Sequence, residues 1–151
     1  WTVDPLQEAI SILSASNNLV VGDFGCGQAQ LAEALSGRHT VHSFDHIAIN
    51  ESVIACDCAD QVPLEDGVLD YAVFSLSLMG RNWADQLNEA WRVLKPTGQI
   101  LIWTANSHLD ITSYNEDIES RGFKILESEA NFKWQKIWGF KDMSRPPQLS
   151  R

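Results

Sequence analysis

The sequence predicts an α/β fold with one mostly parallel sheet that ends in an antiparallel hairpin. Over the first 120 residues, short apolar runs alternate with segments of helical periodicity, which indicates parallel strands joined by helices. Two apolar runs near the end of the chain are separated by only two residues, too few for a parallel connection. A length of 151 residues, 44% of them hydrophobic and 21% charged, suits one globular domain covering the whole chain, residues 1–151.

The first third of the chain predicts a helix, a strand, a second helix and a second strand. Residues 4–16 carry apolar side chains at helical spacing behind an Asp-Pro pair that is typical of a helix start. The apolar run 19–24 predicts a buried strand. After a glycine-containing turn, helical spacing returns over residues 28–35 and stops at a glycine. Residues 40–45 predict the second strand.

The middle of the chain predicts two strands with unusually short connections. Residues 52–56 form a weak strand pattern, and residues 68–76 form an apolar run typical of a strand buried on both faces. About six residues, 46–51, lead into the third strand, and about eleven, 57–67, lead into the fourth. Because a parallel crossover usually needs a dozen or more residues, we expect loops or a single helical turn in place of two middle helices.

The remaining elements complete the sheet. Residues 83–94 predict an amphipathic helix, and the Lys-Pro-Thr-Gly run after it is typical of a helix end. A fifth strand over 99–104 and a helix over 110–120 follow. The closing hairpin pairs 123–130 with 133–141. The prediction is therefore a Rossmann-like, seven-stranded, mostly parallel sheet with a C-terminal antiparallel hairpin and abbreviated middle helices.

Charge is distributed unevenly along the chain. The 11 Lys and Arg residues against 20 Asp and Glu give a net charge of −9, which argues against a surface that coats nucleic acid. Residues 1–120 carry a net charge of −13 and residues 121–151 a net charge of +4. The basic end is either a solvated amphipathic hairpin or an edge that faces an anionic substrate. In the second case the candidate RNA contacts are Lys133, Lys136, Lys141 and Arg145.

Cysteine and hydropathy patterns exclude several classes of protein. Cys26, Cys56 and Cys58 form no CxxC pair and no zinc-ligand spacing, so we expect small buried thiols, no metal and a reduced, intracellular chain. The four histidines are too scattered to form a ligand set. No apolar run approaches the roughly 18 residues of a membrane helix, and no signal peptide opens the sequence.

The residues that carry chemistry begin with a strand, a glycine-rich turn and a helix start over 20–29. Gly25 and Gly27 let the backbone approach a ligand closely, and the start of a helix offers free N–H groups. A dinucleotide-binding turn needs Gly or Ala at its sixth position, where this chain has Gln30. With Asp23 two residues before the first glycine, the D-x-G-x-G pattern resembles the first motif of class I S-adenosylmethionine-dependent methyltransferases.

Two further carboxylates follow at predicted strand ends. Asp45 lies 20 residues after Gly25 and can accept two hydrogen bonds from ribose hydroxyls. Asp57 ends the third strand and can accept from an adenine amino group. The alternative for both is a helix cap or a solvated strand end, and Asp23 could simply order the glycine turn. For Asp70, support of a turn is the preferred interpretation.

Several longer runs carry a closer resemblance. They cover residues 21–27, 41–45, 56–57, 61–66, 72–80, 89–96 and 122–125. This set is similar to the nucleomethylin family of ribosomal-RNA adenine-N1 methyltransferases, which take part in rRNA processing. The Leu-Ser-Leu-Met-Gly run at 76–80 is more specific to that family than the glycine turn.

The resemblance implies S-adenosylmethionine as cofactor, with contacts at Gly25, Asp45, Asp57, Cys58 and Ser75. Cys58 stands where the family can have Met, and Ser75 where it can have Cys. The full set of expected cofactor-binding residues is Asp23, Gly25, Gly27, Asp45, Asp57, Cys58 and Ser75. The methyl acceptor is expected beyond the end of the fourth strand.

The resemblance also implies a ribosomal-RNA substrate, and it locates most RNA contacts outside this chain. The family has a basic N-terminal extension and a histidine before the first helix, and a chain beginning at Trp1 contains neither. We therefore expect a domain of a longer protein, located in the nucleolus of a eukaryote or the cytoplasm of a prokaryote.

Three function hypotheses remain open from the sequence. The first is methylation of adenine N1 in ribosomal RNA, and the second is methylation of a small molecule or protein, favoured by the acidic charge and short length. The third is a non-catalytic, cofactor-binding regulatory module. No catalytic residue is assigned, because the N1 lone pair of adenine is unprotonated near neutral pH and needs no general base.

Overall fold

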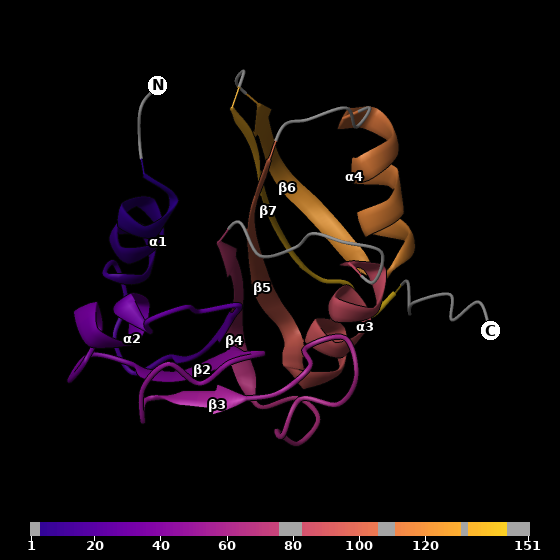
Figure 1. The fold of residues 1–151 in the computed structure, drawn as a ribbon. Helices are drawn as coiled ribbons and strands as arrows, with labels where there is room; N and C mark the ends of the chain where they lie inside the picture. The colour runs from indigo at the N-terminus through magenta and orange to yellow at the C-terminus, as the bar shows by residue number, and fades with distance from the viewer. Residues whose placement is uncertain (1–3, 76–82, 106–110, 131–132, 145–151) are drawn as a thin grey trace.

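The computed structural model describes residues 4–75, 83–105, 111–130 and 133–144 as a single sheet with helices on both faces (Figure 1). The strands are β1 Val20–Phe24, β2 Thr40–Asp45, β3 Val53–Ala55, β4 Leu69–Ser75, β5 Leu94–Ala105, β6 Phe123–Ala130 and β7 Trp134–Lys141. Their order in the sheet is β3-β2-β1-β4-β5-β7-β6. The pairs from β3 to β5 are parallel, and β7 pairs antiparallel with both β5 and β6. The predicted fold class is confirmed.

In the described parts of the chain, four helices cover the two faces of the sheet. α1 Pro5–Leu13 and α2 Gln30–Ala34 lie on one face, and α3 Trp83–Val93 and α4 Ile111–Ser120 lie on the other (Figure 1). A separate hydrophobic cluster fills the space between the sheet and each pair of helices. None of the described helices is long and apolar enough to cross a membrane.

Local backbone chemistry explains where α1 and α2 begin. The Asp4 side chain caps α1 by accepting a 3.2 Å hydrogen bond from the amide of Leu6. α1 ends at Leu13, three residues before the predicted end. α2 is shorter than the predicted segment 28–35 because Ala29 has a φ of 61°, a left-handed conformation that a helix cannot continue through.

The two connections on either side of β3, residues 46–52 and 56–68, are fully described and contain no helix. Their short length predicted this. The second of them is held against α3 by Arg92. Its guanidinium donates to the carbonyl oxygens of Val62 at 2.9 Å and Leu64 at 2.8 Å and forms an ion pair with Asp66 at 2.9 Å. Side chains of α3 therefore satisfy backbone groups in a loop that occupies the place of a middle helix.

β5 begins five residues earlier than predicted. The Lys-Pro-Thr-Gly run, residues 95–98, was predicted to follow the end of the helix, but it forms a bulge inside β5. The pairing register with β4 shifts there, and Thr97 has a φ of 61°. Gly98 is needed there because a Cβ would lie 2.9 Å from the carbonyl oxygen of Lys95. The sequence pattern marked the end of the helix correctly but could not show that pairing resumes at once.

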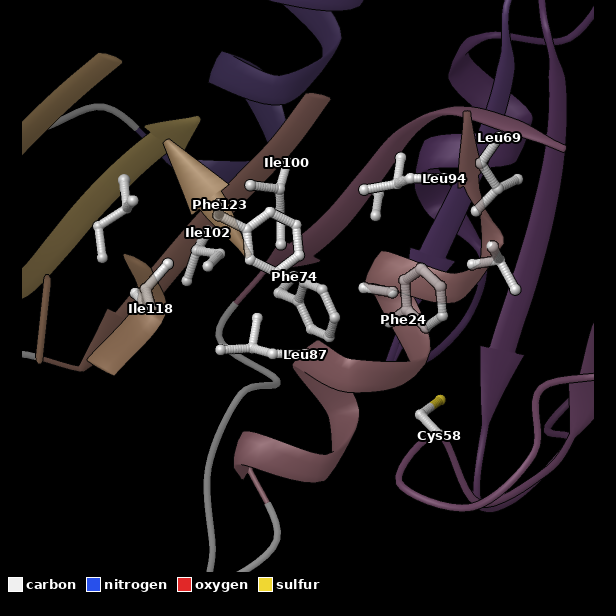
Figure 2. Packing of buried hydrophobic residues seen from close by; sticks show 14 of the residues in the cluster. Phe24, Cys58, Leu69, Phe74, Leu87, Leu94, Ile100, Ile102, Ile118 and Phe123 are labelled. Atoms are coloured by element: carbon white, nitrogen blue, oxygen red, sulfur yellow. The ribbon is translucent and has the colours of Figure 1, made fainter. Parts of the chain in front are cut away.

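The core beneath α3 and α4 is built largely from aromatic and aliphatic side chains of β1, β4 and β5 (Figure 2). The rings of Phe24 and Phe74 stack with centroids 4.9 Å apart. Cys58 and Leu87 belong to the same cluster, which runs toward Phe123 at the start of β6. This packing fixes the carboxyl ends of the central strands, where the predicted site residues lie.

Candidate functional site

The glycine turn after β1 folds back onto β2. Gly25 and Gly27 have φ values of 76° and 57°, a region that glycine occupies at low cost. The amides of Gly25 and Cys26 both donate to the carbonyl oxygen of Phe44, at 2.8 and 2.9 Å. The turn therefore lies directly against the end of β2, as the strand–turn–helix motif predicts.

Asp45 connects this turn to the next strand. Its Oδ2 accepts a 2.9 Å hydrogen bond from the amide of Gly27, and its main-chain oxygen accepts one of 2.9 Å from Cys56. The ordering of the glycine turn, which the sequence left as an alternative role for Asp23, is thus a role of Asp45. One carboxylate oxygen is engaged in the turn, which leaves the other to accept from a ligand hydroxyl.

Asp23 is the buried carboxylate of the site, with 4% of its surface exposed. It lies opposite Ser43 of β2 and Val73 of β4 in the two parallel ladders. Burial, and to a smaller extent the nearby negative charge of Asp45, together raise the pKa of Asp23 to about 7. A cationic ligand group beside Asp23 would favour its ionised form, and a buried carboxyl group with so perturbed a pKa is a candidate binding residue.

A cavity of about 120 Å³ lies beside Asp23. It is lined by Leu6, Ala9, Asp23, Gly25, Cys26, Gln30, Leu31, Val73 and Ser75. Three predicted residues, Asp23, Gly25 and Ser75, thus meet at one cavity. Sequence reasoning missed the contribution of α1, whose Leu6 and Ala9 form part of the wall, because helical periodicity predicts a buried face but not what that face covers.

The remaining two predicted residues, Asp57 and Cys58, are not among those that line this cavity. The exposed Asp57 accepts a 2.9 Å hydrogen bond from the amide of Ala59, so in this structure it caps a turn at the end of β3. Cys58 is 8% exposed and packs in the core. Burial raises the pKa of the Cys58 thiol to about 12, with further contributions from Cys56. Cys58 therefore supports the turn from behind, and neither residue lines the cavity.

The other chemistry-bearing residues have structural roles. Asp70 accepts from the amide of Val20 at 2.8 Å and pairs with Lys95 at 3.1 Å, at the opposite end of β1 from the glycine turn, so its role is structural but it holds the start of a strand where a turn was expected. Within the described part of the chain, the cysteines are free thiols and no cluster of three or more metal-ligating side chains occurs. The run 76–80, which was expected to be specific to the resembled family, lies outside the described residues.

Two of the four lysine and arginine residues predicted to contact RNA are buried, so their prediction as surface contacts is wrong. Lys136 is 7% exposed and pairs with Glu8, and Lys141 is 5% exposed and donates a 2.8 Å hydrogen bond to the carbonyl oxygen of Leu94. Both face the interior because β7 is an internal strand with helices over its two faces. Lys133 is exposed, and Arg145 lies outside the described residues.

Comparison with known proteins places these features in a family context. Residues 1–149 match the model of a family described as hypothetical methyltransferase. A protein of Schizosaccharomyces pombe named 25S rRNA (adenine(645)-N(1))-methyltransferase is 50% identical over 130 residues, which cover 83% of this chain and 41% of that protein. Ribosomal RNA-processing protein 8 of Dictyostelium discoideum is 37% identical over 150 residues, 98% of this chain and 38% of the relative. The chain thus spans less than half the length of these curated relatives.

Solved structures share the fold at low sequence identity. A Burkholderia thailandensis 1,6-didemethyltoxoflavin-N1-methyltransferase, solved with bound S-adenosylhomocysteine, superposes with a TM-score of 0.74 at 18% identity, over 91% of this chain and 78% of that one. A TehB-like S-adenosylmethionine-dependent methyltransferase of Corynebacterium glutamicum gives a TM-score of 0.74 at 16% identity, over 93% and 89%. At this sequence identity, these similarities establish the fold and do not identify the substrate.

Proposed function

The chain belongs to the hypothetical methyltransferase family, and from this premise we propose that it transfers a methyl group from S-adenosylmethionine to N1 of an adenine in ribosomal RNA. The acceptor is supported by the 50% identical fission-yeast relative, whose name states that reaction. Relatives named ribosomal RNA-processing protein 8 support the same RNA class. In a eukaryote the corresponding place of action is the nucleolus.

The hydrogen bond between Gly27 and Asp45 is the observation that best supports the cofactor. It holds a carboxylate against a glycine turn, where its second oxygen can accept from the ribose of S-adenosylmethionine. Asp23, buried beside the cavity, suits the cationic amino group of the methionine part. We assign Gly25 and Ser75 to the cavity wall and Asp57 to the adenine, with Cys58 supporting the turn from the core.

Methyl transfer from S-adenosylmethionine requires mainly that the protein align the donor with the acceptor. S-adenosylmethionine supplies a methyl group already activated by the positive charge on sulfur. The chain has to hold donor and acceptor in line and exclude water. Adenine N1 has a free lone pair near neutral pH, so no catalytic base is required. We expect the acceptor base beyond Ser75, at the carboxyl end of β4, because ligands of parallel sheets bind outside the carboxyl ends of the strands.

Calorimetric titration tests the cofactor part of this proposal. The chain is expected to bind S-adenosylhomocysteine with a saturable signal and to give no saturable response to NAD. For the acceptor, deletion of the gene for the full-length protein is expected to remove one N1-methyladenine from ribosomal RNA, and the wild-type gene is expected to restore it. Saturable NAD binding without a response to S-adenosylhomocysteine would contradict the cofactor assignment, and an unchanged rRNA methylation map would contradict the acceptor.

A second candidate function is a cofactor-binding module without turnover on RNA. It is favoured by the net charge of −13 on residues 1–120 and by the inward orientation of Lys136 and Lys141. S-adenosylhomocysteine binding combined with an unchanged rRNA methylation map would support this candidate. A basic region elsewhere in the full-length protein, as expected from the resemblance, would remove the electrostatic objection to an RNA substrate.

A further inference from the structure

We propose that the largely buried ion pair between Glu8 and Lys136 positions α1 over the cofactor cavity, so that Lys136 acts on cofactor binding through Glu8. The inference rests on the proposed function, because it concerns the same cavity. Glu8 stands in α1 between Leu6 and Ala9, the two α1 residues that line the cavity wall. A change in how Glu8 is held therefore moves that wall directly.

The contacts of Lys136 show how strongly the two elements are joined. Its ammonium group pairs with the Glu8 carboxylate and lies 3.6 Å from Oε1 of Glu127 on the neighbouring strand β6. The side chains of Lys136 and Glu8 are only 9% and 15% exposed. Burial lowers the pKa of Lys136, but the hydrogen bond and the charges of Glu8 and Glu127 outweigh it and raise the pKa above its ordinary value of 10.5. The lysine therefore stays charged in this buried position.

The pair supplies orientation that the apolar packing of α1 lacks. α1 has nine residues, a length at which a helix is marginal without tertiary contacts. Its buried Ala9 and Leu13 pack with Trp103, and two tryptophans of β7, Trp134 and Trp138, pack against the same cluster. The hydrophobic effect that drives these contacts is non-directional, whereas the ion pair joins one named point of the helix to one point of the sheet.

Lys141 gives a matched control for this proposal. It is buried in the same strand, but it faces the other side of the sheet, where its ammonium group lies 4.0 Å from the ring centroid of Trp91. Replacing Lys141 with methionine removes a buried ammonium group from β7 without touching α1. If cofactor affinity falls because the fold is generally destabilised, both Lys136→Met and Lys141→Met should show the loss. If it falls because α1 is displaced, only Lys136→Met should show it.

The test measures S-adenosylhomocysteine affinity by calorimetry and α1 amide protection by hydrogen exchange, on chains shown to be folded by urea titration. Lys136→Met and Glu8→Gln are expected to weaken binding by about tenfold and to expose the amides of α1. Lys141→Met is expected to bind within twofold of the wild type, and so is the conservative Lys136→Arg. In the Glu8→Gln/Lys136→Met double variant the free energy of unfolding is expected to recover, because no unpaired charge remains buried, while affinity stays low.

Unchanged affinity in both Lys136→Met and Glu8→Gln would overturn the proposal, as would equal losses in Lys136→Met and Lys141→Met. Unaltered exchange of the α1 amides in Lys136→Met would also overturn it, and this readout does not depend on any ligand. A wild-type chain that fails to bind S-adenosylhomocysteine would instead contradict the proposed function, so the two failures are distinguishable.

Discussion

The amide of Gly27 donates a 2.9 Å hydrogen bond to Oδ2 of Asp45, although the two residues are 18 positions apart in the chain. This bond joins the turn after β1 to the end of β2, so the carboxylate expected to meet the ribose also shapes the turn expected to meet the rest of the cofactor. The carboxylate of Asp57, by contrast, accepts a local hydrogen bond from the amide of Ala59, two residues further along the chain. The two carboxylates therefore differ in how much of the site depends on them.

We expect Asp45→Ala to cost more cofactor affinity than Asp57→Ala. Asp45→Ala removes charge-assisted hydrogen bonds worth about 1.5–3 kcal/mol each and also releases the Gly27 amide, whereas the Asp57 contact is single and water can replace part of it. Titration of both variants with S-adenosylhomocysteine measures the difference. Equal losses, or the reverse order, would show that the strand ends are assigned to the wrong parts of the cofactor.

A second prediction concerns the pH dependence of stability through Asp23. Its pKa is about 7 in the folded chain against 3.8 without burial, so the folded protein binds the proton more tightly than the unfolded chain. The stability that comes from neutral Asp23 is complete below pH 3.8 and is lost as the pH rises through about 7. Asp23→Asn removes this dependence, so its stabilising effect relative to wild type should grow by about 2–3 kcal/mol from pH 5 to pH 8.

Urea unfolding at the two pH values measures this growth. Asp60→Asn, at an exposed position, serves as the control and should change the free energy of unfolding by less than about 0.5 kcal/mol at either pH. A stabilising effect of Asp23→Asn that is the same at pH 5 and pH 8 would mean that Asp23 does not titrate between them. The same substitution is expected to weaken S-adenosylhomocysteine binding, since the buried carboxyl group is then lost to the ligand.

The order and type of the elements were predictable because each apolar run or stripe is long enough to show its period. The second strand, residues 40–45, has the predicted bounds. The position of β7 between β5 and β6 was not predicted, because a two-residue connection fixes only the antiparallel direction of the hairpin. The immediate start of β5 at Leu94 depends on register with β4, which a single sequence does not contain.

The candidate site shows the same division. The placement of Gly25, Asp45 and Asp23 around one turn was predictable because their types and spacing follow the strand–turn–helix pattern, whereas their contacts with a cofactor stay a prediction. Lys136 was assigned to the surface because lysine is nearly always exposed, and only the tertiary partner Glu8 explains its burial. The roles of Leu6 and Ala9 also depend on tertiary placement, because nothing in their local pattern distinguishes a cavity wall from a core contact.

A third prediction compares two glycines. A Cβ at Gly139 in β7 would lie 2.6 Å from the carbonyl oxygen of Lys124, a backbone atom of the paired strand, so Gly139→Ala must distort the hairpin. At Gly37 the same change meets no atom within 4 Å and costs only the strain of a φ of 81°. We expect Gly139→Ala to lower the free energy of unfolding by more than about 2 kcal/mol, and Gly37→Ala by about 1 kcal/mol. Urea unfolding of both variants checks this ranking, and a larger effect at Gly37 would contradict it.

The last prediction concerns RNA. This chain by itself is expected to bind RNA weakly, because residues 1–120 carry a net charge of −13 that repels phosphate. The remaining attraction should come from exposed cations of the C-terminal hairpin, Lys124 and Lys133, and not from the buried Lys136 and Lys141. Neutralising Lys124 and Lys133 to glutamine should lower RNA affinity and reduce the slope of log affinity against log salt concentration by roughly 0.7 per lost phosphate contact on single-stranded RNA. Cofactor affinity should not change.

A gel-shift series at several salt concentrations, with Lys141→Met as the buried control, separates the two pairs of lysines. The control should lose stability but keep the wild-type salt slope, because Lys141 donates to the carbonyl oxygen of Leu94 and does not face solvent. A reduced slope in Lys141→Met, with no change in the Lys124/Lys133 variant, would place the RNA surface elsewhere. Tight RNA binding by the unmodified 151-residue chain would contradict the electrostatic argument itself. Contacts to bases, and not to phosphates, would then have to outweigh the repulsion from the net charge of −13 on residues 1–120.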